Sequence, residues 1–241
     1  TPPLLCQKPS NKLCYIIFTS GTSGIPKGVM VSHSALEKTY LSWLKEFNLL
    51  PSDRHLQLAN LGFDVFIGDF VRALCSGGTL VLLPDDYLLK PKNLYQYMVD
   101  KEINSAEFVP AVLLKLIGFL QSSKKNLHFM KRLICGSDLI TVKEFKLIYS
   151  FCHPQVELIN SYGLTEATID SSYFKYNDSV LSRLNEYSLV PIGKPFSHVQ
   201  IYIGKEDYRT SPLGVEGEIL IGGEALADGY WNQPELTESK F

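Results

Sequence analysis

The chain has 241 residues, 45% hydrophobic and 20% charged, with 23 Lys plus Arg, 25 Asp plus Glu and a net charge of −2. This balance is typical of a globular protein and gives no reason to expect nucleic acid or an anionic membrane surface as a partner. No apolar stretch approaches the roughly 20 residues that a membrane helix needs. No two of the five cysteines have C-x-x-C spacing, so we expect reduced thiols in a cytoplasmic protein. The five histidines form no H-E-x-x-H metal-binding pattern.

Short β-rich segments alternate with helical segments over the first part of the chain. Several of these strands are apolar on both faces, which is typical of a parallel sheet covered by helices. Strands are predicted over residues 14–19, 55–60, 79–84, 106–110, 131–135 and 156–160, and the clearest helices over 65–76, 93–101, 111–120 and 142–151. The repeated β-α-β order predicts an α/β fold with a layered, largely parallel β-sheet flanked by helices.

The helix predicted over residues 142–151 carries a start signal in its sequence. Thr141 precedes it and Glu144 follows three residues later, which is the spacing of a capping box.

The pattern changes after about residue 175. Two strands, 198–204 and 217–223, are joined by a charged, turn-rich segment without a long helix. This predicts a smaller β-rich, barrel-like region toward the C-terminus. We therefore divide the chain into residues 1–175, an α/β core, and residues 176–241, a β-rich continuation of the same unit.

A loop rich in glycine and hydroxyl groups, "TSGTSGIPKG", follows the first predicted strand. Glycines let backbone N–H groups approach an anion, hydroxyls add donors, and a lysine supplies a point charge, so the loop suits phosphate. Its donors are Thr19, Ser20, Thr22 and Ser23, its glycines are Gly21, Gly24 and Gly28, and its cation is Lys27. Pro26 and Gly28 depart from the P-loop pattern of common NTPases. On composition alone, a plain flexible surface loop is an equal alternative.

Four segments in order resemble the motifs of the adenylate-forming (AMP-binding) superfamily, which contains acyl-CoA synthetases, luciferases and adenylation domains of nonribosomal peptide synthetases. They are "YIIFTSGTSGIPKGVMVSH" (15–33), "LINSYGLTEATI" (158–169), "VPIGKPF" (190–196) and "GEILIGGEALADGYWNQPELTESKF" (217–241). A fifth, "FDVFIGDFVRALCSGGTLVLLP" (63–84), is most similar to amino-acid adenylation domains. The resemblance extends over almost the whole chain.

The resemblance implies ATP and Mg²⁺ as ligands and assigns roles to several side chains. The loop holds the β- and γ-phosphates, Asn160 meets the adenine edge, and Tyr162 stacks on the base. Thr165 donates to the α-phosphate and Glu166 binds Mg²⁺, so Lys27, Thr165 and Glu166 are the expected catalytic residues. The expected nucleotide-binding set is Thr19, Ser20, Gly21, Thr22, Ser23, Gly24, Lys27, Gly136, Ser137, Asn160, Ser161, Tyr162, Gly163 and Thr165. Without the motifs, a core aromatic at 162 and a solvated carboxylate at 166 would be the simpler interpretations.

Two positions depart from the family pattern. Leu164 stands where the family more often has Pro. Ser137 and Asp138 stand where a second Gly and a Glu are usual, next to Gly136.

The same resemblance implies an amino-acid pocket. Asp64 is expected to pair with the substrate α-ammonium, although an aspartate before a predicted helix is also a good N-cap. The expected pocket is Asp64, Val65, Gly68, Ala111, Leu133, Cys135, Ser161, Ile169 and Asp170. Because Asp170 adds a second carboxylate to a mostly apolar set, we expect a substrate with a polar or basic side chain, ornithine-like or serine-like.

The expected reaction is ATP-dependent formation of an aminoacyl-AMP with release of pyrophosphate, followed by transfer to a carrier-protein thiol. In the family, a ribose-binding aspartate and a C-terminal subdomain with a catalytic lysine come after the position of Phe241. We therefore expect residues 1–241 alone to have little activity. Two alternatives stay open: an acyl-CoA synthetase or carrier-loading ligase, for which Asp64 has little use, and a non-catalytic nucleotide-binding remnant.

Overall fold

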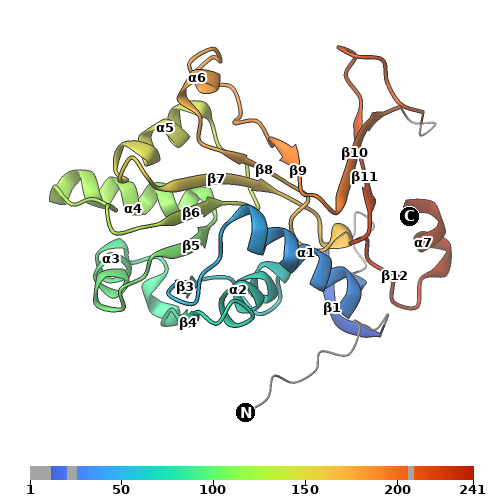
Figure 1. Cartoon of the computed structure of the whole chain (residues 1–241), viewed down its shortest axis with the longest axis horizontal. Helices are drawn as coiled ribbons and strands as arrows, with labels where there is room; N and C mark the ends of the chain where they lie inside the picture. The colour runs from blue at the N-terminus through green and yellow to red at the C-terminus, as the bar shows by residue number, and fades with distance from the viewer. Residues whose placement is uncertain (1–11, 21–25, 206–208) are drawn as a thin grey trace.

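A seven-stranded sheet forms the centre of the protein in the computed structural model, which describes residues 12–20, 26–205 and 209–241 (Figure 1). Its strand order is β4-β3-β5-β6-β7-β8-β9; the neighbouring pairs from β4 to β7 are parallel, and β8 and β9 are antiparallel additions. The strands are β3 (Arg54–Gln57), β4 (Thr79–Leu82), β5 (Ser105–Phe108), β6 (Arg132–Cys135), β7 (Glu157–Tyr162), β8 (Ser172–Lys175) and β9 (Lys194–Pro195). The prediction of a largely parallel sheet is confirmed.

Helices cover both faces of this sheet. The four predicted helices are present as α2 (Asp64–Leu74), α3 (Pro91–Asp100), α4 (Pro110–Ser123) and α5 (Val142–Ser150), and sequence analysis did not single out α1 (His33–Glu46). Residues of α3, α4 and α5 share one apolar core with the sheet, while residues of α1 and α2 pack in a second core on its other face. Side chains alternate along a strand, so Leu133 and Cys135 enter the first core and Ile134 the second.

The predicted capping box of α5 is confirmed. The Thr141 hydroxyl accepts a hydrogen bond from the Glu144 backbone N–H at 3.3 Å, and the Glu144 carboxylate accepts one from the Thr141 N–H at 2.9 Å. Both bonds satisfy N–H groups that the first turn of a helix leaves without backbone partners.

The strand predicted at 14–19 is present, but it lies outside the parallel sheet. This strand, β1 (Leu13–Thr19), pairs antiparallel with β2 (Lys27–Ser32), which also pairs with β12 (Gly229–Tyr230). The apolar residues on both faces of β1 therefore reflect packing in a small three-stranded sheet, β1-β2-β12, and not a place in the parallel sheet. In the sequence, the loop expected to bind phosphate lies between β1 and β2, and β12 from the C-terminal part of the chain pairs with β2.

The predicted β-rich region contains a two-stranded antiparallel ribbon, β10 (Val199–Gly204) with β11 (Glu218–Gly223), which projects away from the central sheet (Figure 1). The remaining elements are α6 (Asp178–Leu181), α7 (Pro234–Lys240) and the 3-10 turns η1 (Asp85–Tyr87) and η2 (Thr165–Ala167). Because β9 lies beyond residue 175 and still pairs with β8, the division of the chain at that residue stays a prediction. Within the described ranges, no helix is both long and apolar enough to cross a membrane.

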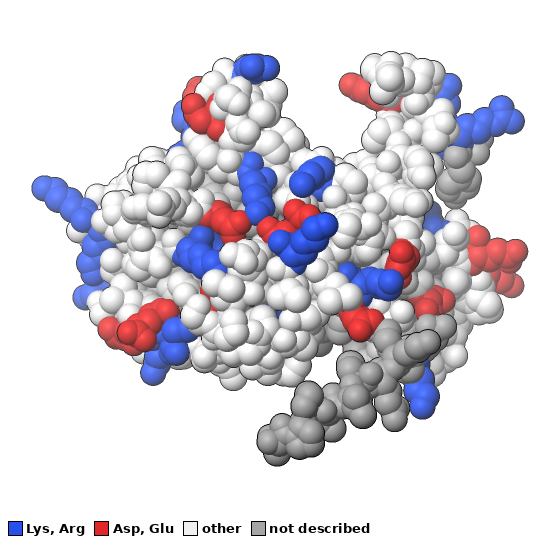
Figure 2. All heavy atoms as spheres, viewed as in Figure 1, with Lys and Arg blue, Asp and Glu red and all other residues white. Residues whose placement is uncertain are grey.

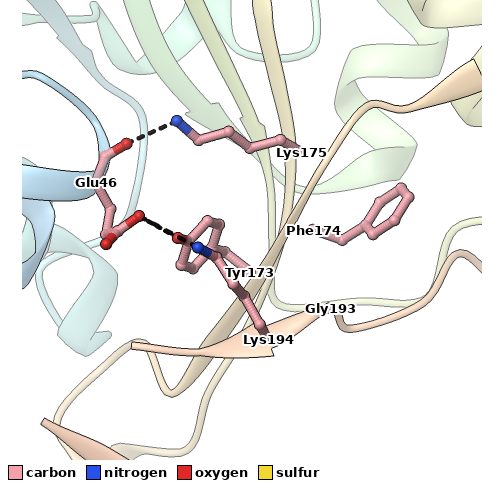
Figure 3. Close-up of a pocket in the computed structure, with 6 residues that line it drawn as sticks. All are labelled: Glu46, Tyr173, Phe174, Lys175, Gly193 and Lys194. Atoms are coloured by element: carbon pink, nitrogen blue, oxygen red, sulfur yellow. Dashed lines mark hydrogen bonds and ion pairs between the residues drawn. The ribbon is translucent and has the colours of Figure 1, made fainter. Parts of the chain in front are cut away.

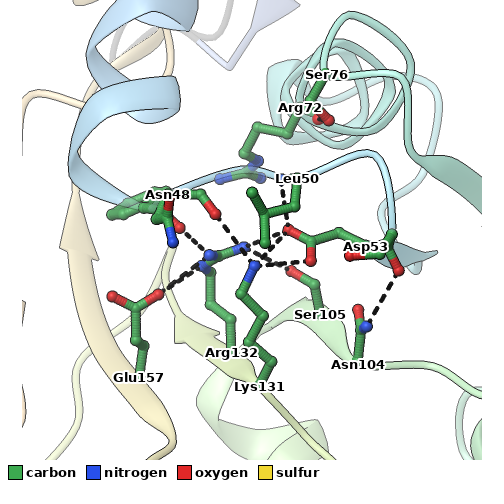
Figure 4. A network of polar contacts seen from close by, with 12 residues as sticks. Asn48, Leu50, Asp53, Arg72, Ser76, Asn104, Ser105, Lys131, Arg132 and Glu157 are labelled. Carbon is green, nitrogen blue, oxygen red and sulfur yellow. Dashed lines mark hydrogen bonds and ion pairs between the residues drawn. The ribbon is translucent and has the colours of Figure 1, made fainter.

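A polar network ties together the amino ends of the central strands (Figure 4). Arg132, whose side chain is fully buried, lies 3.1 Å from Glu157 and 3.5 Å from Asp53, and Lys131 binds Asp53 at 2.7 Å. Ser105 accepts a further bond from Arg132 at 3.4 Å. These groups satisfy one another, which is the condition for burying charge, so the network joins β3, β5, β6 and β7 structurally.

Candidate active site

A cavity of about 410 Å³ lies at the opposite, carboxyl ends of the parallel strands. Ligands in open α/β sheets bind at this edge, where the loops after the strands diverge. Its lining comes from the segment after β3, the start of α2, the ends of β5 and β6, and α4. The lining residues are Leu58, Ala59, Asn60, Phe63, Asp64, Val65, Leu88, Glu107, Phe108, Val109, Val112 and Ser137.

Asp64 brings a buried carboxylate to this cavity. It is the first residue of α2 and only 8% exposed, and the N-cap position belongs to Phe63, so the interpretation of Asp64 as an N-cap is wrong. Burial raises the pKa of the Asp64 carboxyl, a hydrogen bond with the Thr165 side chain lowers it, and the nearby charge of Glu107 raises it. A buried carboxylate without a cation is a strong partner for an ammonium group.

A second cavity, of about 440 Å³, contains Lys27 and Glu166. The Tyr230 hydroxyl donates a 2.7 Å hydrogen bond to Glu166, and the Lys27 ammonium lies 5.2 Å from the centre of the Tyr230 ring. Glu166 is half-buried and keeps one carboxylate oxygen outside this bond. The cavity therefore brings a cation from the end of the phosphate-loop motif next to a carboxylate from the "NSYGLTE" motif, 139 residues apart (166 − 27).

The segment between these cavities is tightly folded. Thr165 and Glu166 lie in η2, and Thr168 and Ile169 have backbone φ angles of 57° and 74°. Positive φ is unfavourable for a β-branched residue, and such strain concentrates at functional sites. Gly163 allows the fold, because a Cβ there would lie 1.7 Å from the Ile169 carbonyl oxygen. The Thr165 contact with Asp64 joins this segment to the first cavity.

A cluster of buried charges lies behind the first cavity. Arg72 of α2, with a side chain 2% exposed, contacts Asp69 at 3.1 Å, Asp170 at 3.5 Å and also Glu107. Asp170 accepts further hydrogen bonds from the Trp43 indole at 2.9 Å and from Ser161. Thus the structure gives Asp170 protein partners at both oxygens.

Three other predicted pocket residues, Gly68, Ser161 and Ile169, surround this cluster. Ser161 and Asp170 are hydrogen-bonded, and a Cβ on Gly68 would lie 3.3 Å from the Arg72 guanidinium and 3.4 Å from Ile169. Sequence reasoning missed Glu107 and Arg72. A charged residue inside an otherwise apolar predicted strand, and an Asp-x-x-Arg spacing on one helix face, were the signals available for them.

Three predicted pocket residues lie elsewhere. Ala111 is exposed in the first turn of α4, and Leu133 and Cys135 are buried in the core beneath α4 and α5. On their strand Leu133 and Cys135 point to the face opposite Ile134. Burial and the nearby charge of Glu107 raise the pKa of the Cys135 thiol, so Cys135 lies within reach of that charge. The expected role of these three residues in the amino-acid pocket stays a prediction.

The predicted nucleotide-binding residues have the following positions. Gly136 packs against the charge cluster, because a Cβ there would lie 2.7 Å from a Glu107 oxygen, and Ser137 lines the first cavity. Asn160 donates its amide to the Pro191 carbonyl at 3.1 Å, and burial raises the pKa of the half-buried Tyr162. Thr19 is the last residue of β1 and Ser20 follows it, whereas Gly21, Thr22, Ser23 and Gly24 lie outside the described residues.

A third hollow, of about 420 Å³, lies on the surface beside β8 and β9 (Figure 3). Its polar groups pair with each other: Tyr173 donates to Glu46, and Lys175 donates to the Glu46 carbonyl at 2.7 Å. It contains none of the predicted site residues. On the face shown in Figure 2, basic and acidic side chains are interspersed rather than gathered by sign.

Comparison with known proteins shows the family to which the chain belongs. The model of the family described as "AMP-binding enzyme" matches residues 2–231, so the chain belongs to this family. It is 41% identical over 230 residues to bacitracin synthase 2 of Bacillus licheniformis, covering 95% of this chain and 9% of that protein.

Two solved structures of nonribosomal peptide synthetases have a fold similar to that of this chain. The AMPPNP-bound form of the nonribosomal peptide synthetase FmoA3 (S1046A) superposes with a TM-score of 0.86 at 27% identity, covering 96% of this chain and 24% of that one. The four-domain nonribosomal peptide synthetase AB3403, bound to AMP and glycine, superposes with a TM-score of 0.82 at 28% identity, covering 95% of this chain and 16% of that one. The predicted family and fold class are confirmed, and the chain spans less than a tenth of the curated relative's length.

Proposed function

We propose that this chain contributes the amino-acid and ATP sites of an amino-acid adenylation domain. The observation that carries the proposal is the buried Asp64 carboxylate, which lines the first cavity. The side chain of Thr165, in the segment that bears Glu166, is close enough to lower the pKa of this carboxylate. An ammonium group at Asp64 would bring the adjacent substrate carboxylate toward that segment. The relatives support the same class of reaction, since one solved form is bound to AMP and glycine.

The proposed reaction joins the amino acid to AMP. A carboxylate oxygen of the substrate attacks the α-phosphorus of ATP, the bond from that phosphorus to the bridging oxygen breaks, and pyrophosphate leaves. The protein provides position and charge rather than covalent chemistry. Asp64 orients the amine, Thr165 supplies a hydroxyl at the α-phosphate, and Lys27 supplies positive charge at the departing phosphates. Asn160, Ser161, Tyr162, Gly163, Gly136 and Ser137 form the proposed adenine side.

Glu166 fits the proposed Mg²⁺. Mg²⁺ prefers oxygen ligands and is commonly held by one or two carboxylates together with substrate phosphates. Glu166 has one oxygen fixed by Tyr230 and the other free of that bond, and no group of three or more metal-ligating side chains occurs in the described parts of the chain. When bound, Mg²⁺ would neutralise phosphate charge.

The partners are also proposed from the relatives. A carrier-protein thiol is the proposed acceptor of the aminoacyl group, in keeping with the nonribosomal peptide synthetases among the solved structures. A lysine-bearing C-terminal subdomain and a cytoplasmic location are proposed from the resemblance of the motifs. Activity of residues 1–241 alone is proposed to be low, because those parts lie outside the matched motifs.

The test is amino-acid-dependent exchange of labelled pyrophosphate into ATP, with the product of the complete reading frame and a panel of amino acids. Asp64→Asn should lower kcat/KM for the preferred amino acid by about 100-fold or more, because it leaves a buried ammonium without its charge partner. The KM for ATP should stay near the wild-type value.

Asp138→Asn is the matched control, since the Asp138 side chain is exposed and accepts a hydrogen bond from the neighbouring Leu139 N–H at 2.7 Å. Exchange with fatty or aryl acids and none with amino acids would replace this proposal with the acyl-CoA synthetase alternative. Intact ATP binding with no exchange for any acid would favour a non-catalytic remnant.

A further inference from the structure

The charges behind the first cavity do not balance. Within 3.5 Å of the Arg72 guanidinium lie carboxylates of Asp69, Glu107 and Asp170, each with a side chain about 4% exposed. Among the described residues, one guanidinium therefore faces three carboxyl groups. His55, also buried nearby, adds no positive charge near neutral pH, because burial and the charges of Arg72 and Arg132 lower its pKa to about 3.

One polar atom in this cluster lacks a partner. The second carboxylate oxygen of Asp69 is buried and has no hydrogen bond to the described residues, while its first oxygen binds Arg72. Burial raises the pKa of Asp69 to about 8 and that of Asp170 to about 7, so the cluster holds protons that a cation would displace. Buried carboxylate in excess of its cations favours binding of a further cation.

The cluster reaches the cavity through Glu107. This side chain lines the cavity, lies close enough to Asp64 for its charge to raise that pKa, and binds Arg72 with one carboxylate oxygen. Its other oxygen packs against Gly136, where a Cβ would approach to 2.7 Å. Arg72 is fixed in turn by the Trp43 ring, 4.8 Å from the guanidinium. Thus Arg72 holds Glu107 in the wall that a substrate side chain would face.

We propose that Arg72 is a specificity-determining residue that holds Glu107 in the cavity wall, and that Glu107, backed by the buried carboxyl groups of Asp69 and Asp170, selects an amino acid whose side chain carries an ammonium group. The inference rests on the proposed function and names its substrate class. The α-ammonium would bind at Asp64 and the side-chain ammonium at Glu107. Arg72 acts through Glu107 and does not itself contact the substrate.

The test compares ornithine with norvaline, which has the same carbon skeleton without the second amine, in pyrophosphate exchange by the product of the complete reading frame. We expect the wild-type protein to prefer ornithine by at least about 100-fold in kcat/KM, as for a buried charge pair. Glu107→Gln, which keeps the shape and removes the charge, should lower that preference at least about tenfold.

Arg72→Met should raise the KM for ornithine at least about tenfold, because Glu107 loses the guanidinium that holds it in the cavity wall, while the KM for ATP stays unchanged. Arg72→Lys should restore part of the preference. Because the cluster gains negative charge as its protons leave, the KM for ornithine should fall between pH 6 and pH 8, whereas that for norvaline should not change. A merely structural role for Arg72 would not produce this difference.

Arg132→Met is the matched control, since Arg132 is equally buried among carboxylates but lies at the amino ends of the strands (Figure 4). It should lower stability without changing the ratio of ornithine to norvaline. If Arg72→Met does not fold, three results still test the proposal: the preference of the wild-type protein for ornithine, the pH dependence of that preference, and the effect of Glu107→Gln.

A wild-type preference for an uncharged amino acid would overturn this inference and leave the proposed function intact. So would an unchanged ornithine to norvaline ratio in both Glu107→Gln and Arg72→Met. No exchange with any amino acid would overturn the proposed function itself.

Discussion

At the scale of single residues, the candidate site depends on positions where another backbone or carboxylate comes unusually close. Gly163 meets the carbonyl oxygen of Ile169, and Gly136 meets Glu107. Both glycines were predicted as nucleotide-binding residues from the motifs. The structure adds a physical reason for each, because any side chain would displace the segment that carries Thr165 and Glu166 or the Glu107 carboxylate.

Gly163→Ala should destabilise the protein by about 3 kcal/mol or more, since its Cβ would overlap backbone that cannot move without unfolding the turn. Urea unfolding measures the change. Gly118→Ala is the control: Gly118 lies within α4 with no atom near its Cβ position, so alanine should stabilise by about 0.5–1 kcal/mol. Equal effects of the two substitutions would contradict the close approach.

At the scale of elements, local signals in the sequence predicted most helices and strands. The capping box before α5 is present as expected, and a proline occupies the first turn of α4. The sequence did not indicate which sheet each strand joins: β1 pairs with β2 rather than with the central strands. It also did not indicate which strand face meets which helices: Leu133 and Cys135 of β6 lie in the core with α4 and α5, whereas Ile134 lies in the core with α1 and α2.

The α5 cap gives a test at this scale. Thr141→Ala removes the hydroxyl that accepts the Glu144 N–H and should cost about 1 kcal/mol of stability. Glu144→Gln keeps an oxygen for the Thr141 N–H and should lower the stability by only about a few tenths of a kcal/mol. Thermal unfolding of both variants provides the measurement, and an unchanged midpoint for Thr141→Ala would show that the cap contributes nothing.

At the scale of the whole molecule, four buried groups with shifted pKa values should control the pH dependence of stability. Burial raises the pKa of Asp69 to about 8 and of Asp170 to about 7, and lowers that of His55 to about 3 and of His198 to about 4. The folded protein binds more protons than the unfolded chain at the two carboxyls, so their contribution falls as pH rises from about 4 to about 8.

At the histidines the unfolded chain binds more protons, so their contribution rises between about pH 3 and 6.5 and then stays constant. The two effects oppose each other below pH 6.5, and only the carboxyl effect remains above it. We expect the free energy of unfolding to fall between pH 6.5 and 8, by at most about 1.4 kcal/mol per pH unit for each proton involved. Urea unfolding at several pH values measures this slope, and Asp69→Asn should reduce it; stability that rises over this interval would refute the assignment.

The amino-acid sequence by itself determined the family, the α/β class, most elements and the motif residues, because each signal lies within a short continuous segment. Only the tertiary structure decided which of those residues meet. Arg72 contacts Glu107 across 35 residues and Asp170 across 98, and no local spacing encodes such contacts. They arise because β5, β6 and β7 pair in parallel and turn one face of the sheet toward α2, which carries Arg72. Ser161 lies on that side, next to Asp170, whereas Cys135 lies in the core on the opposite face.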